Sequence, residues 1–213
     1  MSSPDPPRPL KTRDRIVQTS LQLFNDVGEP RITTNHIADE LDISPGNLYY
    51  HFHNKDEIVS ALFADYEREI DALLTLRDTQ PREAEDIWFF LHLLFEIIWK
   101  YRFIYRDIND LLTRSRLIET HFQRILAHKQ QTALALCNGL AASGALEATP
   151  DELAALAVNI TLVTSFWLSF EHARQPRKPP DIGRGIYQVM SLAAPWLRGP
   201  ARQLLQKLSH EYL

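Results

Sequence analysis

The 213-residue chain has only one cysteine, Cys137, so no disulfide can form within it. Such sparse use is typical of proteins in a reducing compartment, and we expect a cytoplasmic protein. Residues 1–10 hold four prolines and no apolar stretch, so we expect no secretory signal peptide. The sequence also lacks the alternation of apolar and polar residues that predicts strands. These absences exclude a disulfide scaffold and leave helices as the expected structure.

Patterns of common catalytic and metal sites are missing as well. The Gly-x-Gly at 183–185 follows no strand and has no third glycine, so it predicts no phosphate-binding loop. His51 and His53 have no carboxylate or cysteine partner at metal-ligand spacing. His128 lies about two and a half helical turns from Cys137, too far to activate the thiol. We therefore predict that the protein is not an enzyme and holds no metal or cofactor.

No apolar run is long and pure enough to predict a membrane span. The longest, Leu153 to Phe170, contains five polar interruptions: Asn159, Thr161, Thr164, Ser165 and Ser169. A helix covered on two sides by protein explains this composition better. We expect no membrane partner.

A basic excess is missing from the N-terminal part, where a nucleic-acid-binding protein often has one. Residues 1–58 hold six Lys or Arg and nine Asp or Glu, a net charge of −3. The positive charges cluster at Arg8, Lys11, Arg13 and Arg15. The net charge alone therefore argues weakly against DNA binding, whereas the clustering of the positive charges does not.

The segment 32–55 contains a pattern of helix starts. Thr33 is an N-cap residue type at the start of one helix, and Ser44 followed by Pro45 starts a second. Asp42 lies in the turn, where a positive φ is usually needed and Asp is tolerated better than most residues. The pattern predicts two short helices joined by a tight turn.

The second of these helices presents a surface that suits a partner. Leu48 and Phe52 lie four residues apart and face inward, which leaves Tyr49 and Tyr50 outside. Two consecutive exposed tyrosines are a poor solvated surface, so we expect another molecule to cover them.

This segment resembles the helix-turn-helix of the TetR family of bacterial transcriptional regulators. The family pattern occurs here as Thr33-Thr34, Ile37-Ala38, Ser44, Gly46, Leu48-Tyr49, Tyr50, His51-Phe52 and Lys55. Asp42 stands where the family usually has glycine in the turn. The resemblance extends over about the first sixty residues and implies a double-stranded DNA operator as partner, with contacts mostly to the backbone.

We expect the DNA-binding surface on the two short helices. The helix N-termini at Thr34 and Ser44 offer N–H groups and hydroxyls to phosphates, and Asn47 can bond a base edge. Gly46 removes a side chain where backbone must approach DNA closely. The expected contact residues are Thr33, Thr34, Ser44, Pro45, Gly46, Asn47, Tyr49, Tyr50, His51 and Lys55. Alternatively, the tyrosines and His51 only pack against the next helix.

The whole chain is predicted to be all-α. A three-helix helix-turn-helix domain with a Pro-rich arm at 1–10 occupies 1–57, and a larger helical bundle at 58–213 serves ligand binding and dimerisation. Helices are expected at 11–27, at 34–41, at 45–52, from a cap at Asn54 to about Leu76, from Pro81 to Trp99, at 101–107, at 116–142, from Thr149 to His172, at 182–194 and from Pro200.

Aromatic residues are too abundant in the larger domain for one small core. One interpretation is an apolar ligand pocket between helices, which the family resemblance favours, and the other is core plus dimer interface. The candidate pocket residues are Trp88, Phe95, Trp99, Phe103, Tyr105, Phe122 and Trp167. The expected effector is an apolar or amphipathic small molecule.

A homodimer is expected because the helix 153–170 is apolar nearly all round and needs a cover beyond its own subunit. The candidate interface residues are Ala154, Val158, Phe166, Ile186 and Met190. Together the patterns predict a DNA-binding transcriptional regulator, most simply a repressor that its effector releases from a palindromic operator. An activator, or an architectural or protein-partnered DNA-binding protein of the same fold, is the alternative.

Overall fold

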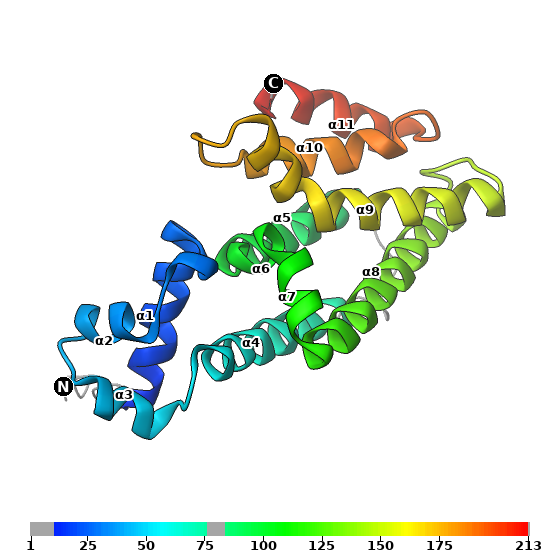
Figure 1. Cartoon of the computed structure of the whole chain (residues 1–213). Coiled ribbons are helices and arrows are strands. Elements are labelled where there is room, and N and C mark those ends of the chain that lie inside the picture. Colours follow the sequence, from blue (N-terminus) through cyan, green and yellow to red (C-terminus); the bar gives the residue numbers. More distant parts are fainter. Residues whose placement is uncertain (1–10, 76–83, 213) are drawn as a thin grey trace, which may run out of the picture. The chain divides into compact units, whose positions relative to one another are not determined.

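The computed structural model describes residues 11–75 and 84–212, and every regular element in these ranges is a helix (Figure 1). A single isolated β-bridge joins Leu146 to Leu197. The all-α prediction is therefore confirmed. The expected arm at 1–10 and helix start at Pro81 lie outside the described residues. The described chain divides into two compact units within one helix, between Asp65 and Tyr66.

The first unit has short helices whose ends follow local sequence signals. Its elements are α1 (Thr12–Val27), the 3₁₀ turn η1 (Glu29–Arg31), α2 (Thr34–Glu40), α3 (Pro45–His51) and the start of α4 (Lys55–Thr75). Gly28 ends α1 with a φ of 109°, a backbone conformation that favours glycine. Asn54 caps α4, because its Oδ1 accepts a hydrogen bond from the Glu57 amide at 2.9 Å.

A small core holds the first unit together. Each of four helices contributes fully buried apolar side chains, which include Ile16, Ile37, Leu48 and Ile58. Phe24 and Phe52 fill the remaining space. Because Leu48 and Phe52 face this core, the opposite side of α3 is turned outward.

The second unit is a larger helical bundle. It contains the rest of α4 and then α5 (Ala84–Lys100), α6 (Arg102–Arg106), α7 (Ile108–Arg114), α8 (Arg116–Ala142), α9 (Pro150–Arg174), α10 (Ile182–Ala193) and α11 (Gly199–Tyr212). The long helices α8 and α9 pack against each other, and α10 packs on both α9 and α5 (Figure 1). Thr149 and Glu152 form the capping box that starts α9.

Helix α9 is long and apolar enough to cross a membrane by length and composition alone, with 44% of its most apolar stretch buried inside the protein. Its buried residues include Leu156, Trp167 and Leu168, which face the bundle. This pattern fits a core helix with one further face to cover.

Candidate DNA-binding surface and ligand cavity

Helix α2 begins at a reciprocal cap that fixes the position of Thr33 and Thr34. The Thr33 hydroxyl accepts a hydrogen bond from the His36 amide, and the Thr33 amide donates to His36 Nδ1, both at 3.3 Å. Histidine here takes the place that Glu or Gln has in the usual capping box. Sequence reasoning missed His36, although its spacing of three residues from Thr33 was a usable signal.

The turn between α2 and α3 has the predicted backbone conformation. Asp42 has a φ of 52°, and among the described residues it is the sole non-glycine with a positive φ. The turn leads into α3, whose N-cap residue is Ser44. The Ser44 hydroxyl accepts a hydrogen bond from the Asn47 amide at 3.2 Å, and Pro45 occupies the first helical position.

Gly46 lies in the first turn of α3 with open space around it. A Cβ at this position would meet only Ser44 Oγ, at 3.9 Å. Nothing in the protein's own packing therefore requires a glycine. This agrees with the expectation that another molecule approaches the backbone here.

The two tyrosines of α3 differ in exposure and contacts. Tyr50 is 82% exposed, and its ring makes an edge-to-face contact with that of His51, with centroids 5.1 Å apart. The Tyr49 hydroxyl lies 3.1 Å from Thr34 Oγ1 and so connects α3 to the start of α2. Asn47 is also exposed. The outward face of α3 thus brings an amide, a phenol and an imidazole together beside two helix N-termini.

Lys55 has a structural task that the sequence did not indicate. Its ammonium donates to the Glu29 carbonyl at 3.0 Å and forms an ion pair with Glu29 Oε1, also at 3.0 Å. The Glu29 side chain is 0% exposed, whereas Lys55 is 22% exposed. Two interactions of Lys55 therefore serve the buried carboxylate and backbone of η1, and a phosphate contact would come in addition to them.

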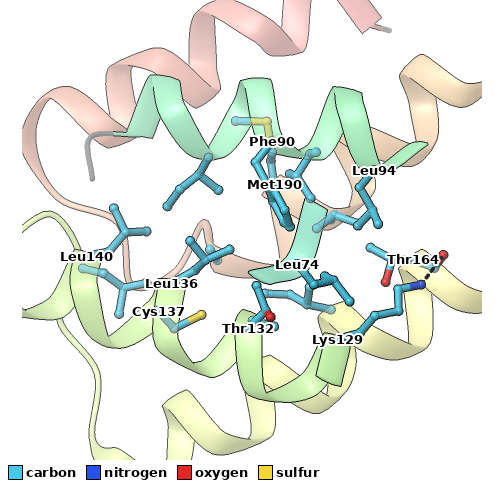
Figure 2. A pocket seen from close by; sticks show the side chains of 17 residues that line it. Leu74, Phe90, Leu94, Lys129, Thr132, Leu136, Cys137, Leu140, Thr164 and Met190 are labelled. Carbon is cyan, nitrogen blue, oxygen red and sulfur yellow. Dashed lines mark hydrogen bonds between the residues drawn. The ribbon is translucent and has the colours of Figure 1, made fainter. Parts of the chain in front are cut away.

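In the second unit, a cavity of about 70 Å³ lies between α5 and α8, with α9 and α10 closing its sides. It is lined by Leu74, Ile87, Phe90, Leu91, Leu94, Lys129, Thr132, Ala133, Leu136, Cys137, Leu140, Leu146, Ile160, Thr164, Val189, Met190 and Ala193. Figure 2 shows Leu140 at one end and Lys129 with Thr164 at the other. The lining is apolar except for Lys129, Thr132 and Thr164.

Two family descriptions match almost the whole described chain. "Bacterial regulatory proteins, tetR family" matches residues 16–62, which contain the capped α2–α3 pair. "Bacterial transcriptional repressor" matches residues 65–205, the helical bundle with the cavity. The chain belongs to the TetR family of bacterial transcriptional regulators. Members of this family are regulators and not enzymes.

A TetR-family regulator from Marinobacter aquaeolei VT8 has a similar structure throughout. It is 36% identical, has a TM-score of 0.85, and the match covers 95% of this chain and 99% of that one. The Escherichia coli "Tetracycline repressor protein class C" is 36% identical over 76 residues, which is 35% of this chain and 32% of that protein. The chain therefore matches about a third of the length of this curated relative.

A more distant TetR-fold regulator, from Saccharomonospora viridis, was solved in complex with choline. It is 18% identical with a TM-score of 0.65, and the match covers 84% of this chain and 93% of that one. At this identity the likeness establishes the shared fold alone.

None of the seven aromatic residues predicted to line a ligand pocket lies in the wall of the cavity in the second unit. Phe95, Phe103, Tyr105 and Phe122 are all nearly or fully buried in the core. Large rings fill core volume efficiently, so the remaining space lies where aliphatic side chains of α5 and α8 meet less completely. These four residues therefore belong to the core of the bundle.

The three tryptophans predicted for the pocket also lie outside the cavity wall. Trp167 is buried and its Nε1 donates to the Asp181 carbonyl at 2.9 Å. Trp88 packs on His92 with ring centroids 4.3 Å apart. The guanidinium of Arg102 lies over the ring of Trp99, with its Cζ 4.6 Å from the ring centroid. Trp88 and Trp99 are half-buried.

The exposed face of α9 forms an apolar stripe at every fourth position. It consists of Ala154, Val158, Leu162, Phe166 and Phe170, all exposed. Three of these were predicted for the dimer interface, while Leu162 and Phe170 were missed. The stripe follows the helical repeat and continues along most of α9.

The two residues of α10 that were predicted for the dimer interface face the interior of their own subunit. Ile186 is 2% exposed and Met190 lines the cavity. Helix α10 is amphipathic, and its apolar side packs into its own subunit. These two residues are therefore assigned to the interior, because sequence cannot tell which apolar face covers its own core.

Charged side chains fasten the second half of α4 to α8. Glu67 pairs with His121 Nδ1 at 2.8 Å and with Arg124 at 2.7 Å. Asp71 pairs with Arg124 at 2.8 Å and with His128 at 3.2 Å. Such partly exposed pairs contribute little stability singly, but here they connect two helices along two turns.

Cys137 lies in the cavity wall. Burial raises the pKa of its thiol to about 11, so it stays protonated and unreactive near neutral pH. Cys137 thus packs as a small buried hydrophobic side chain.

Proposed function

We propose that the protein is a homodimeric cytoplasmic repressor that binds a palindromic operator through α3 and leaves it when a small apolar molecule enters the cavity. The outward face of α3 is the observation that carries this proposal. Its exposed Tyr50, its uncovered Gly46 and its fixed Ser44 cap make an ordered surface that the described residues leave open.

The DNA contacts follow from this geometry. In the family arrangement, α3 enters a major groove, and the N-termini of α2 and α3 aim amide groups and the Thr34 and Ser44 hydroxyls at the backbone. Asn47 and Tyr50 can meet base edges or the thymine methyl, since both are exposed on the outward face of α3. Gly46 allows the backbone of α3 to approach the DNA. Thr33 and Lys55 act mainly by holding these elements in position.

The apolar stripe on α9 is the proposed dimer contact. Five exposed apolar side chains at four-residue spacing suit a symmetric partner helix, because a twofold axis pairs the same stripe with itself. A dimer supplies two copies of α3, and two copies are what a palindromic site needs.

Helix α4 is the proposed connection between effector and DNA. It begins at Lys55, beside the DNA-binding surface, and Leu74 near its other end lines the cavity. The cavity of about 70 Å³ is smaller than the roughly 150 Å³ cavity that admits benzene. An effector must therefore displace its walls, and the α4–α8 ion pairs would pass that displacement along α4.

Selection from a pool of random duplexes tests the DNA part of the proposal. Enrichment of an inverted repeat bound by two copies of the chain would support it, and recovery of no preferred sequence would refute it. Adding hydrophobic compounds to the isolated complex then tests the effector part. Release with a rise in melting temperature is expected of a ligand sensor, whereas release only by another protein would indicate a protein-partnered regulator.

A further inference from the structure

Lys129 is a charged side chain in an otherwise apolar place. It projects from the middle of α8 and is 4% exposed. Around it are the ring of Tyr105 on α6, whose centroid is 5.4 Å from Nζ, and the polar atoms of Thr164 and Ser165 on α9. Among the described residues, no carboxylate lies within ion-pair distance of Nζ. A buried lysine without a counter-charge is costly, which suggests that it serves a partner outside the chain.

The hydrogen bonds of Lys129 with the described residues use two of its three donors, and its Nζ also lies over the Tyr105 ring. Its ammonium donates to the Thr164 carbonyl at 3.3 Å and to Ser165 Oγ at 3.0 Å. Figure 2 shows this amine at one end of the cavity next to Thr164.

Thr132 supplies a second polar group in the cavity wall. It is 2% exposed, lines the cavity, and its Oγ1 makes no hydrogen bond with the described residues. It lies three residues after Lys129 on α8, and Figure 2 shows it nearer the middle of the cavity, apart from the Lys129 amine, which is directed toward Thr164. Buried hydroxyls are normally paired, and an unpaired one that lines a cavity points to a ligand atom.

We propose that the effector is an apolar organic acid whose carboxylate binds the Lys129 ammonium at one end of the cavity, with its apolar body extending past Thr132 among the side chains of α5, α8 and α10. This rests on the proposed function, because it names the chemistry of the molecule that enters the same cavity. One buried ammonium matches the single negative charge of a carboxylate. A phosphate would bring a second charge without a partner, and a cation would be repelled by Lys129.

The ionisation of Lys129 agrees with this geometry. Burial lowers the pKa of its ammonium to about 7 in the ligand-free protein. A carboxylate beside it favours the charged form and raises the pKa again. Binding of the acid above neutral pH must therefore take up a proton from solution, whereas binding below pH 7 needs none.

Calorimetric titration with butanoate, hexanoate and octanoate, each compared with the alcohol of equal length, tests the proposal on the full-length protein. The wild type should bind each acid at least about tenfold more tightly than its alcohol. The Lys129→Met variant should lose this preference and keep its affinity for the alcohols. Lys207→Met, on the exposed side of α11, is the matched control and should behave as the wild type. At about pH 8, proton uptake should accompany binding of acids to the wild type and be absent in Lys129→Met.

Three results would overturn the proposal: equal affinity of the wild type for acids and alcohols, unchanged acid affinity in Lys129→Met, or no binding of any acid. Release of a selected duplex, followed in the same samples, separates this proposal from the proposed function. Lys129-dependent binding of acids without DNA release would refute the regulatory role and sustain the carboxylate site. Release of DNA by alcohols alone would sustain the regulatory role and refute the carboxylate site.

Discussion

Replacing Lys55 by Met should destabilise the first unit strongly, although Lys55 stands where a DNA contact is expected. The substitution keeps the length of the side chain and removes its charge. It leaves the Glu29 carboxylate, 0% exposed, without the ammonium that lies 3.0 Å away. The Glu29 carbonyl loses its Lys55 donor at the same time.

The size of the loss follows from the burial of Glu29. Removing one partner of a buried ion pair usually costs about 3–5 kcal/mol, because the other charge remains in a medium that solvates it poorly. Lys55 itself is 22% exposed, so water can reach its site and lower the cost. We therefore expect about 3 kcal/mol at neutral pH, at the low end of that range.

Urea unfolding followed by circular dichroism measures this loss. The double variant Glu29→Gln/Lys55→Met should recover most of it, since no buried charge then remains. Lys11→Met, at an exposed lysine before α1, is the control and should change stability by less than about 0.5 kcal/mol. A loss below about 1 kcal/mol in Lys55→Met, or no recovery in the double variant, would refute the reasoning.

Three further predictions concern the second unit. Gly185→Ala should cost about 1–3 kcal/mol in urea unfolding, because its Cβ would lie 2.7 Å from Trp167 and 2.9 Å from Phe95; unchanged stability would contradict this close packing. Leu162→Glu should give a monomer in sedimentation analysis, whereas Phe89→Glu, at an exposed site on α5, should leave the dimer intact; a dimeric Leu162→Glu would remove α9 from the interface. Between about pH 7 and 10.5 the unfolded chain binds a proton at Lys129 that the folded chain does not. Unfolding free energy should therefore rise with pH in the wild type by several kcal/mol more than in Lys129→Met, and parallel pH curves would contradict the burial of this amine.

Local signals in the sequence were enough to predict most of the fold. Helix α8 begins and ends at the predicted Arg116 and Ala142, and the Thr149 capping box starts α9 as expected. Asp42 adopts the positive φ expected of the turn. Each of these features depends on neighbours a few residues apart, so pattern and propensity suffice to find them.

The features that were missed depend on contacts between distant residues. Lys55 pairs with Glu29, which is 26 positions earlier, and no periodicity indicates this. The cavity lies where five helices meet, so its lining depends on packing and not on the number of aromatic residues. In the sequence Lys129 cannot be told from a solvated lysine of a helix, and only the structure shows that it is buried.

Operator affinity of Gly46→Ala, compared with its stability, tests the central claim that the outward face of α3 binds DNA. A Cβ at residue 46 has free space within the protein, and alanine favours a helix over glycine by about 0.5–1 kcal/mol. Unfolding free energy should therefore stay the same or rise, while affinity for the selected duplex should fall by about tenfold or more as the Cβ meets the DNA backbone. Tyr50→Ala should lose affinity likewise, and Phe89→Ala should bind as the wild type does. Wild-type affinity in both α3 variants would show that this face does not contact DNA.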